Sequence, residues 1–104
     1  MIVEQRDYHV YTGKLPELVK LYESEGIAIQ QEALGGLVGA FTTDIGELSF
    51  YTSLWSYPDF EARAERRAAL QQRDDWKAFL GKIVPLIHTQ ANRILLPTPF
   101  SPLR

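Results

Sequence analysis

The stretch that most constrains the fold of this chain is Glu47–Glu61, ELSFYTSLWSYPDFE. Because side chains alternate between the two faces of a β-strand, this stretch divides into two sets. One set is apolar and suits a core: Leu48, Phe50, Thr52 and Leu54. The other set carries large side chains with polar groups, which favour a covered face or a pocket wall: Ser49, Tyr51, Ser53, Trp55 and Tyr57.

A helix is predicted directly after this strand. The spacing Ser56-x-x-Asp59 resembles a capping box, and Pro58 is tolerated in a first helical turn. We expect this helix to run from Pro58 to about Gln72. Three of its residues share one apolar stripe: Phe60, Ala64 and Ala68.

The other elements follow from hydrophobic periodicity and from glycine and proline positions. The first is a strand over Ile2–Tyr11, followed by a helix that begins at Pro16, is weakened by Gly26 and ends at Gly35-Gly36. A strand over Leu37–Asp44 comes next and forms a hairpin with the strand that starts at Glu47. The last two elements are a helix from Asp74-Asp75 to Pro85 and a strand from about Thr89 to Leu96. The strongest helical stripe lies in the last helix: Trp76, Phe79, Leu80, Ile83 and Ile87. The prolines that follow predict an extended, non-helical tail.

The order β-α-β-β-α-β predicts an α+β, ferredoxin-like fold, with a four-stranded antiparallel sheet and helices on one face. We expect residues 1–104 to form one domain of this kind. The other sheet face, predicted to carry Tyr51, Trp55 and Tyr8, would then be bare. A second copy packing sheet against sheet about a two-fold axis would cover it, so a homodimeric barrel, or a higher oligomer, is expected.

Composition excludes several classes of function. The net charge of −2 provides no basic surface for nucleic acid. The chain has no cysteine, and so neither disulfides nor thiolate chemistry. The opening residues MIVEQRDYHV contain no apolar signal region, and no apolar run is long enough to cross a membrane. We therefore expect a cytoplasmic protein that binds neither nucleic acid nor membrane.

Glu4, Arg6 and Tyr8 project from alternate positions of the first strand and are expected to face the same side as Tyr51 and Trp55. Arg6 is a candidate for orienting an anionic substrate and Tyr8 for donating a proton. Alternatively, Arg6 and Glu4 form a buried ion pair. Tyr51 and Trp55 either form a pocket wall or fill the core of a dimer.

Other polar residues give weaker signals. His9 and His88 lack the spacing of a metal site, so no metal is expected. The basic run Arg63, Arg66 and Arg67 is interpreted as a solvated helix face or a contact for the tail, with phosphate or partner binding as the alternative. Asn92 is a candidate substrate-binding residue. Alternatively, Asn92 and Arg93 close the barrel or hold the proline-rich tail. No glycine-rich nucleotide motif or nucleophile elbow is present.

The chain resembles the bacterial NIPSNAP-domain proteins, a branch of the dimeric α/β-barrel superfamily. The resemblance spans almost the whole chain and is carried by short motifs. They are Glu4-x-Arg6-x-Tyr8, Gly13-Lys14, Pro16, Leu21-Tyr22-Glu23, Gly26, Gly39 to Thr43, Ile45-Gly46, Leu54-Trp55-x-Tyr57, Glu61-x-Arg63, Arg66-Arg67-x-x-Leu70, Trp76-x-x-Phe79, Asn92-Arg93-Ile94-Leu95 and the tail from Pro97 to Pro102. It implies a dimeric barrel but no agreed chemistry, and function belongs to sites rather than to folds.

Two alternative functions are therefore considered for the chain. The first is a small-molecule enzyme without a cofactor, monooxygenase- or isomerase-like. It would use Arg6 and Tyr8 as catalytic residues and bind its ligand through Glu4, Tyr51, Trp55 and Asn92. The alternative is a non-catalytic homodimeric module that binds a ligand or a protein partner and has a filled interior.

Overall fold

The computed structural model describes residues 1–104 and has the predicted order of elements. These are β1 (Ile2–Val10), α1 (Leu15–Leu21), a π-helical turn (Tyr22–Gly26), α2 (Ile27–Leu34), β2 (Leu37–Thr42), β3 (Phe50–Tyr57), α3 (Phe60–Gln72), α4 (Asp74–Ile83), a short 3₁₀ turn (Val84–Leu86) and β4 (Ile87–Leu95). The α+β, ferredoxin-like prediction is confirmed. None of the helices combines the length and the apolar character that crossing a membrane requires.

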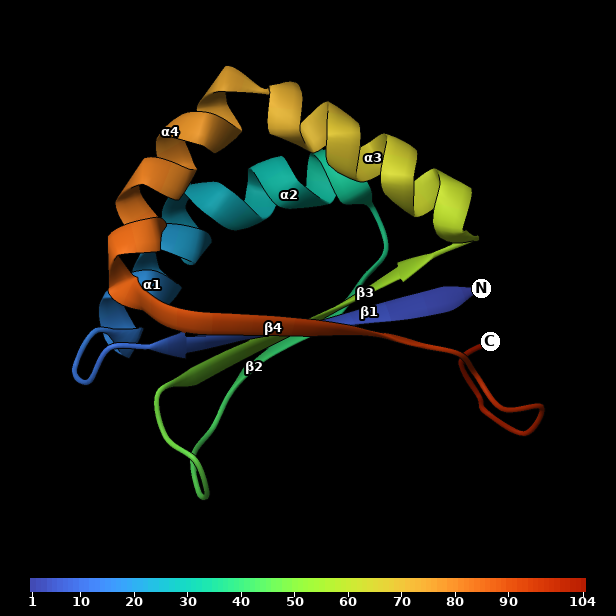
Figure 1. Ribbon diagram of the computed structural model, residues 1–104, viewed down its shortest axis with the longest axis horizontal. Coiled ribbons are helices and arrows are strands. Elements are labelled where there is room, and N and C mark those ends of the chain that lie inside the picture. The colour runs from blue at the N-terminus through green and yellow to red at the C-terminus, as the bar shows by residue number, and fades with distance from the viewer.

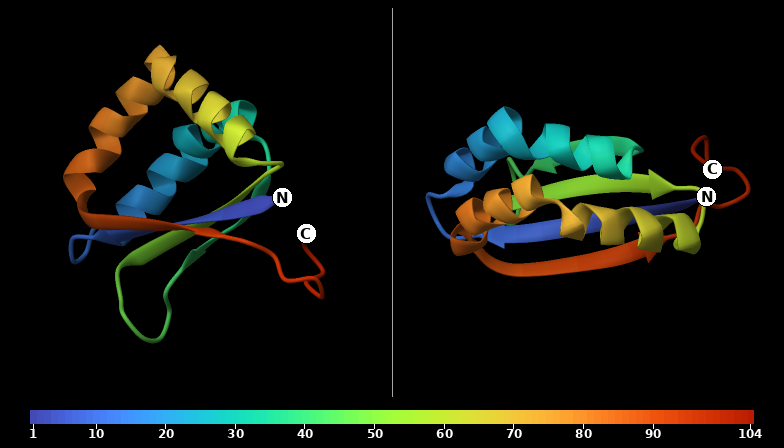
Figure 2. Two further views of the ribbon diagram at one scale, coloured as in Figure 1. Left: turned by 45° about the vertical axis from the view of Figure 1, so that its right-hand side comes forward. Right: turned by 90° about the horizontal axis from the view of Figure 1, so that it is seen from above.

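The four strands form one antiparallel sheet in the order β2-β3-β1-β4. All the helices lie on one face of this sheet, and the opposite face is bare (Figure 1). Seen from above, α1 and α2 lie over the β2–β3 half, and α3 and α4 lie over the β1–β4 half (Figure 2). The interior between the layers is therefore bounded by two helical pairs and the sheet.

The aromatic face of β3 lies beneath the helices, so the prediction that the bare face carries Tyr51, Trp55 and Tyr8 was wrong. Tyr51, Trp55 and Tyr57 are all buried. Both alternating sets of β3 contain large side chains, and the set with more apolar area is the one that the helices cover. The set with less apolar area includes Phe50 and Leu54, which face the bare side of the sheet and are half-buried.

The first strand is oriented as predicted. Glu4, Arg6 and Tyr8 pair across the sheet with Trp55, Ser53 and Tyr51, so they face the same side. The strand β3 begins at Phe50 rather than at Glu47. Ser49 adopts a φ of 65°, which interrupts the strand and leaves Leu48 exposed instead of in the core.

Two helix predictions need correction. The helix α3 begins after Asp59, which is itself the N-cap and accepts a 2.8 Å hydrogen bond from the amide of Ala62. The expected stripe of Phe60, Ala64 and Ala68 is exposed. The inner face of α3 instead carries Leu70, together with arginines that have a buried partner. The predicted stripe of the last helix is confirmed in part: Trp76, Phe79 and Ile83 of α4 are buried and Leu80 is half-buried. Ile87 does not belong to this helix, because it is the first residue of β4.

Candidate functional site

The centre of the interior is the carboxylate of Glu4, which is 0% exposed. Its Oε2 accepts hydrogen bonds from Arg63 Nη2 at 2.7 Å, Asn92 Nδ2 at 2.7 Å and Arg6 Nη1 at 3.1 Å. Arg67 Nη1 lies 3.8 Å from the other carboxylate oxygen, beyond hydrogen-bond range. Three guanidinium groups therefore share one buried carboxylate.

Three elements bring this network together. Arg63 and Arg67 are four residues apart on α3, so they occupy one face of the helix, which points to β1. Asn92 lies opposite Arg6 in the β1–β4 register. The helix start at Asp59 sets which residues of α3 face the sheet, and thereby places both arginines above Glu4.

Glu4 is charged at every physiological pH. Burial by itself raises the pKa of its carboxyl group, but hydrogen bonds from Arg63 and Asn92, with the charges of Arg6 and Arg67, outweigh that effect and hold the pKa at about 2. The carboxylate is thus a permanent counter-ion for the arginines.

A cleft runs beside this network between β4 and the helices α3 and α4; we call it the β4 cleft. Its polar end has a volume of about 360 Å³ and is lined by Arg6, Arg63, Arg67, Gln90, Ala91 and Asn92. Its apolar end, of about 260 Å³, is lined by side chains that include Tyr8, Gln30, Trp76, Leu80, Ile83 and Ile87. The two ends adjoin each other, because Arg6, Arg67 and Gln90 line both.

Arg6 and Tyr8 are hydrogen-bonded to each other in the wall of this cleft. The phenol oxygen of Tyr8 accepts hydrogen bonds from Arg6 Nη2 at 3.1 Å and Arg6 Nε at 3.2 Å. With Nη1 bonded to Glu4, Arg6 has used three of its five N–H groups. Two N–H groups remain for a ligand, and Arg6 is held in one orientation by its neighbours.

A second, more apolar pocket of about 320 Å³ lies between the α1 region and the β2–β3 strands. Tyr22 and Tyr51 line it, with their rings stacked 4.8 Å apart. Burial, with the nearby Tyr8 phenol, raises the pKa of Tyr51 to about 12. Burial and the neighbouring phenols Tyr8 and Tyr51 raise the pKa of Tyr22 well above its usual value. Both groups therefore stay protonated at neutral pH and serve as core residues.

The structure places the predicted site residues in three environments. Arg6, Tyr8 and Asn92 line the β4 cleft. Glu4 is the buried counter-ion, so the ion pair that was the alternative interpretation of Arg6 is present, at 3.1 Å. Tyr51 lines the second pocket, and Trp55 is 0% exposed with its indole N–H bonded to Ser53.

Sequence reasoning missed the role of Arg63 and Arg67 and described them as part of a solvated helix face. Their side chains are only 25% and 20% exposed, and both turn inward to Glu4. Arg66, from the same run, instead donates a 3.1 Å hydrogen bond to the carbonyl of Leu34. The four-residue spacing of Arg63 and Arg67 was the available signal, but their partner lies on a distant strand.

Comparison with known proteins identifies the family. The family model described as NIPSNAP matches residues 3–102. The chain belongs to the NIPSNAP family. Its sequence is 33% identical over 103 residues to Protein NipSnap homolog 1 of Danio rerio, covering 99% of this chain and 36% of that protein. The chain thus spans about a third of the length of this curated NIPSNAP relative.

Solved NIPSNAP structures share the fold closely. A NIPSNAP family protein from Agrobacterium tumefaciens is 50% identical with a TM-score of 0.97, covering 99% of this chain and 98% of that chain. Another from the same organism, described as having unknown function, is 41% identical with a TM-score of 0.97, covering 100% and 94%. An antibiotic biosynthesis monooxygenase is only 11% identical, with a TM-score of 0.67 over 95% of this chain and 100% of that chain. This last likeness concerns the fold alone.

Proposed function

We propose that this NIPSNAP chain is a cofactor-independent small-molecule enzyme, monooxygenase- or isomerase-like, and that the β4 cleft holds its substrate. The single observation that carries the proposal is the Arg6–Tyr8 pair, since both side chains line a cleft of substrate size and are fixed by mutual hydrogen bonds. Of the two reaction classes, isomerisation by proton transfer fits this pair better, because a phenol can donate a proton while a guanidinium offsets developing negative charge.

In such a reaction the substrate presents a carbonyl oxygen to Tyr8. Water takes the carbon-bound proton next to the carbonyl while the Tyr8 phenol donates its proton to the carbonyl oxygen, giving the enol isomer. The Tyr8 phenolate then takes back one proton from the hydronium ion, so no net proton is gained or lost. Arg6 lines the same cleft, and its guanidinium charge stabilises the negative charge that develops on the oxygen. Glu4 takes no part in the proton transfer and holds Arg6 in place.

We expect Tyr8→Phe to slow this proton transfer by at least about 100-fold, the usual contribution of a general acid. The assay is exchange of the α-hydrogens of phenylacetone and phenylpyruvate in deuterium oxide, followed by proton NMR. Tyr11→Phe is the matched control, because Tyr11 is 50% exposed and lies outside the cleft. Exchange no faster than in buffer, or equal in Tyr8→Phe and the wild-type protein, would count against the enzyme and favour the alternative, a non-catalytic binding module.

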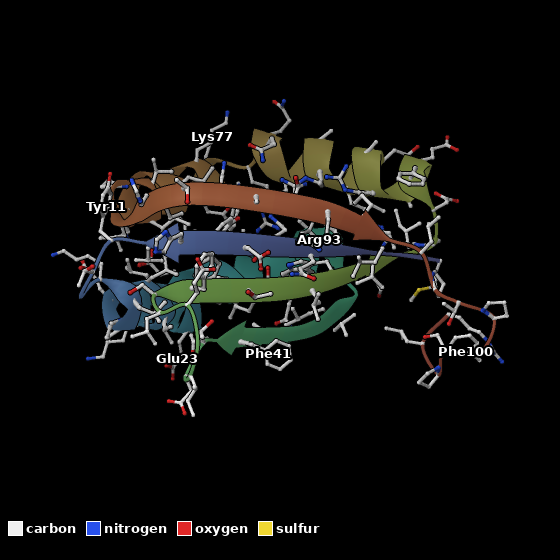
Figure 3. All side chains as sticks on the ribbon, turned by 60° about the horizontal axis from the view of Figure 1, so that its bottom comes forward. Tyr11, Glu23, Phe41, Lys77, Arg93 and Phe100 are labelled. Atoms are coloured by element: carbon white, nitrogen blue, oxygen red, sulfur yellow. The ribbon has the colours of Figure 1, made fainter.

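We further propose that the protein functions as a homodimer through the bare face of the sheet. That face exposes Phe41 by 57% and Leu95 by 38%, beside the half-buried Phe50 and Leu54. Phe41 and Arg93 project from it in Figure 3. A bare sheet face that carries these apolar side chains suits a second copy about a two-fold axis.

Phe41→Asp should raise the dissociation constant of this dimer at least about 100-fold, because two carboxylates would be forced into one apolar interface. Sedimentation equilibrium measures the change. Phe60→Asp is the control: Phe60 is 58% exposed, but on the helical side. A monomeric wild-type protein, or equal weakening by both variants, would contradict the dimer proposal.

A further inference from the structure

We propose that the ligand of the β4 cleft is an organic acid, with one carboxylate held at Arg67 and an apolar body lying against α4. This inference rests on the proposed function in using the same cleft, but it concerns which molecules the cleft selects. Charge, unpaired polar atoms and the division of the cleft into two ends each support it.

The polar end carries excess positive charge. Glu4 is the only carboxylate within 4.0 Å of Arg6, Arg63 or Arg67, and it is fully buried. One carboxylate neutralises one of the three guanidinium groups, so two positive charges remain beside the cleft. Buried cations are stable when an anion pairs with them, and guanidinium groups bind carboxylates through parallel hydrogen bonds.

Arg67 is the residue available for that pairing. Arg63 and Arg6 each hydrogen-bond Glu4, whereas Arg67 lies 3.8 Å from it and its Nη1 is buried without a hydrogen-bond partner. Arg67 also lines both ends of the cleft. A carboxylate at Arg67 would thus complete a cluster that the chain alone leaves unsatisfied.

The other end of the cleft fits an apolar body with a polar substituent. Leu80, Ile83 and Ile87 supply an apolar wall. Trp76 and Gln30 also line this end of the cleft and are only 3% and 2% exposed. Trp76 Nε1 and Gln30 Oε1 are buried and have no hydrogen-bond partner. A buried donor and a buried acceptor without partners are costly, so a hydroxyl or carbonyl group on the ligand would be stabilised there.

Calorimetric titration with hydrocinnamate and its neutral analogue hydrocinnamide tests this selectivity. We expect the wild-type protein to bind the acid at least about tenfold more tightly than the amide, as one charge-assisted hydrogen-bond pair predicts. Arg67→Gln should abolish that preference. Arg66→Gln is the matched control and should keep it, because Arg66 lies outside the cleft and bonds the Leu34 carbonyl.

A second variant tests the position of the apolar body. Val84 lines the apolar end and is 59% exposed, so Val84→Trp narrows this end with little expected effect on folding. It should weaken binding of acid and amide by a similar factor, at least about tenfold, and leave their ratio unchanged. Unchanged binding of both compounds in Val84→Trp would overturn the placement of the body.

Three results would overturn the inference as a whole: equal affinity for acid and amide, an acid preference that survives Arg67→Gln, or phenyl phosphate binding at least about tenfold more tightly than hydrocinnamate. None of these decides the proposed enzyme activity, because deuterium exchange into neutral phenylacetone is measured separately. Conversely, Arg67-dependent binding of the acid without any exchange would support this inference and contradict the enzyme.

Discussion

Replacing Glu4 by Gln is expected to lower the free energy of unfolding by about 3 kcal/mol at neutral pH, because three guanidinium groups then lose their shared counter-ion. The pKa of Glu4 gives a similar magnitude. It falls from an ordinary value of 4.5 to about 2 on folding, and at about 1.4 kcal/mol per pH unit this corresponds to roughly 3 kcal/mol. Urea unfolding at a fixed protein concentration measures the change.

The pH dependence of stability provides a second readout of the same interaction. Because folding lowers the pKa of Glu4, its stabilisation is fully present above pH 4.5 and is lost as the pH falls from 4.5 towards about 2. The Glu4→Gln variant should lose less stability than the wild-type protein across this window. Identical slopes in the two proteins would contradict the account of Glu4.

Glu25→Gln is the matched control. Glu25 also pairs with a cation at 2.7 Å, but it is 37% exposed and its partner Lys82 is 51% exposed. Solvent screens such a pair, so the substitution should cost at most about 1 kcal/mol. If Glu25→Gln and Glu4→Gln lower the free energy of unfolding equally, burial does not determine how much these ion pairs stabilise the protein.

Gly26→Ala is the second substitution with a large expected effect, a loss of about 2–3 kcal/mol of stability. Helix propensity alone predicts the opposite, since Ala is favoured over Gly in a helix by about 1 kcal/mol. A methyl group at Gly26 would overlap the ring of Phe79, which is 1% exposed and packed against Tyr22 and Trp76. Urea unfolding decides between the two effects.

Gly81→Ala separates packing from propensity. Gly81 lies on the exposed side of α4 and has no heavy atom within 4 Å of the added methyl position. The Gly81→Ala substitution should raise the free energy of unfolding by roughly 0.5–1 kcal/mol through helix propensity. If Gly26→Ala is also stabilising, the close packing of the π-helical turn on α4 is incorrect. Phe79→Leu in the Gly26→Ala background should recover part of the loss, because the two sites are in contact.

Most of the fold follows from local patterns. The element order, the position of Gly26 between two helical segments and the common face of Glu4, Arg6 and Tyr8 were all predicted correctly. The prediction of which side chains lie on the bare face of the sheet was wrong, because both alternating sets of β3 contain large side chains. Periodicity identifies two faces, but the choice between them depends on how much apolar area the helices bury.

The site could be predicted only in part. Arg6, Tyr8 and Asn92 are recognisable as polar residues on strands, and the structure places them in the cleft. The roles of Arg63 and Arg67 depend on a partner about 60 residues away, Glu4, with which Arg63 forms a hydrogen bond. A charged helix face looks solvated in a sequence, since nothing local shows that a buried carboxylate lies beneath it.

The central claim is that the β4 cleft binds the ligand, and the two tryptophans of the chain test it most directly. Trp76 lines the cleft and its indole N–H has no partner, whereas Trp55 is fully buried and bonded to Ser53. A proton–nitrogen correlation spectrum gives one indole signal for each, and Trp76→Phe assigns them. Titration with hydrocinnamate should move the Trp76 signal and leave the Trp55 signal in place. A titration that moves neither signal, or only that of Trp55, would contradict the claim.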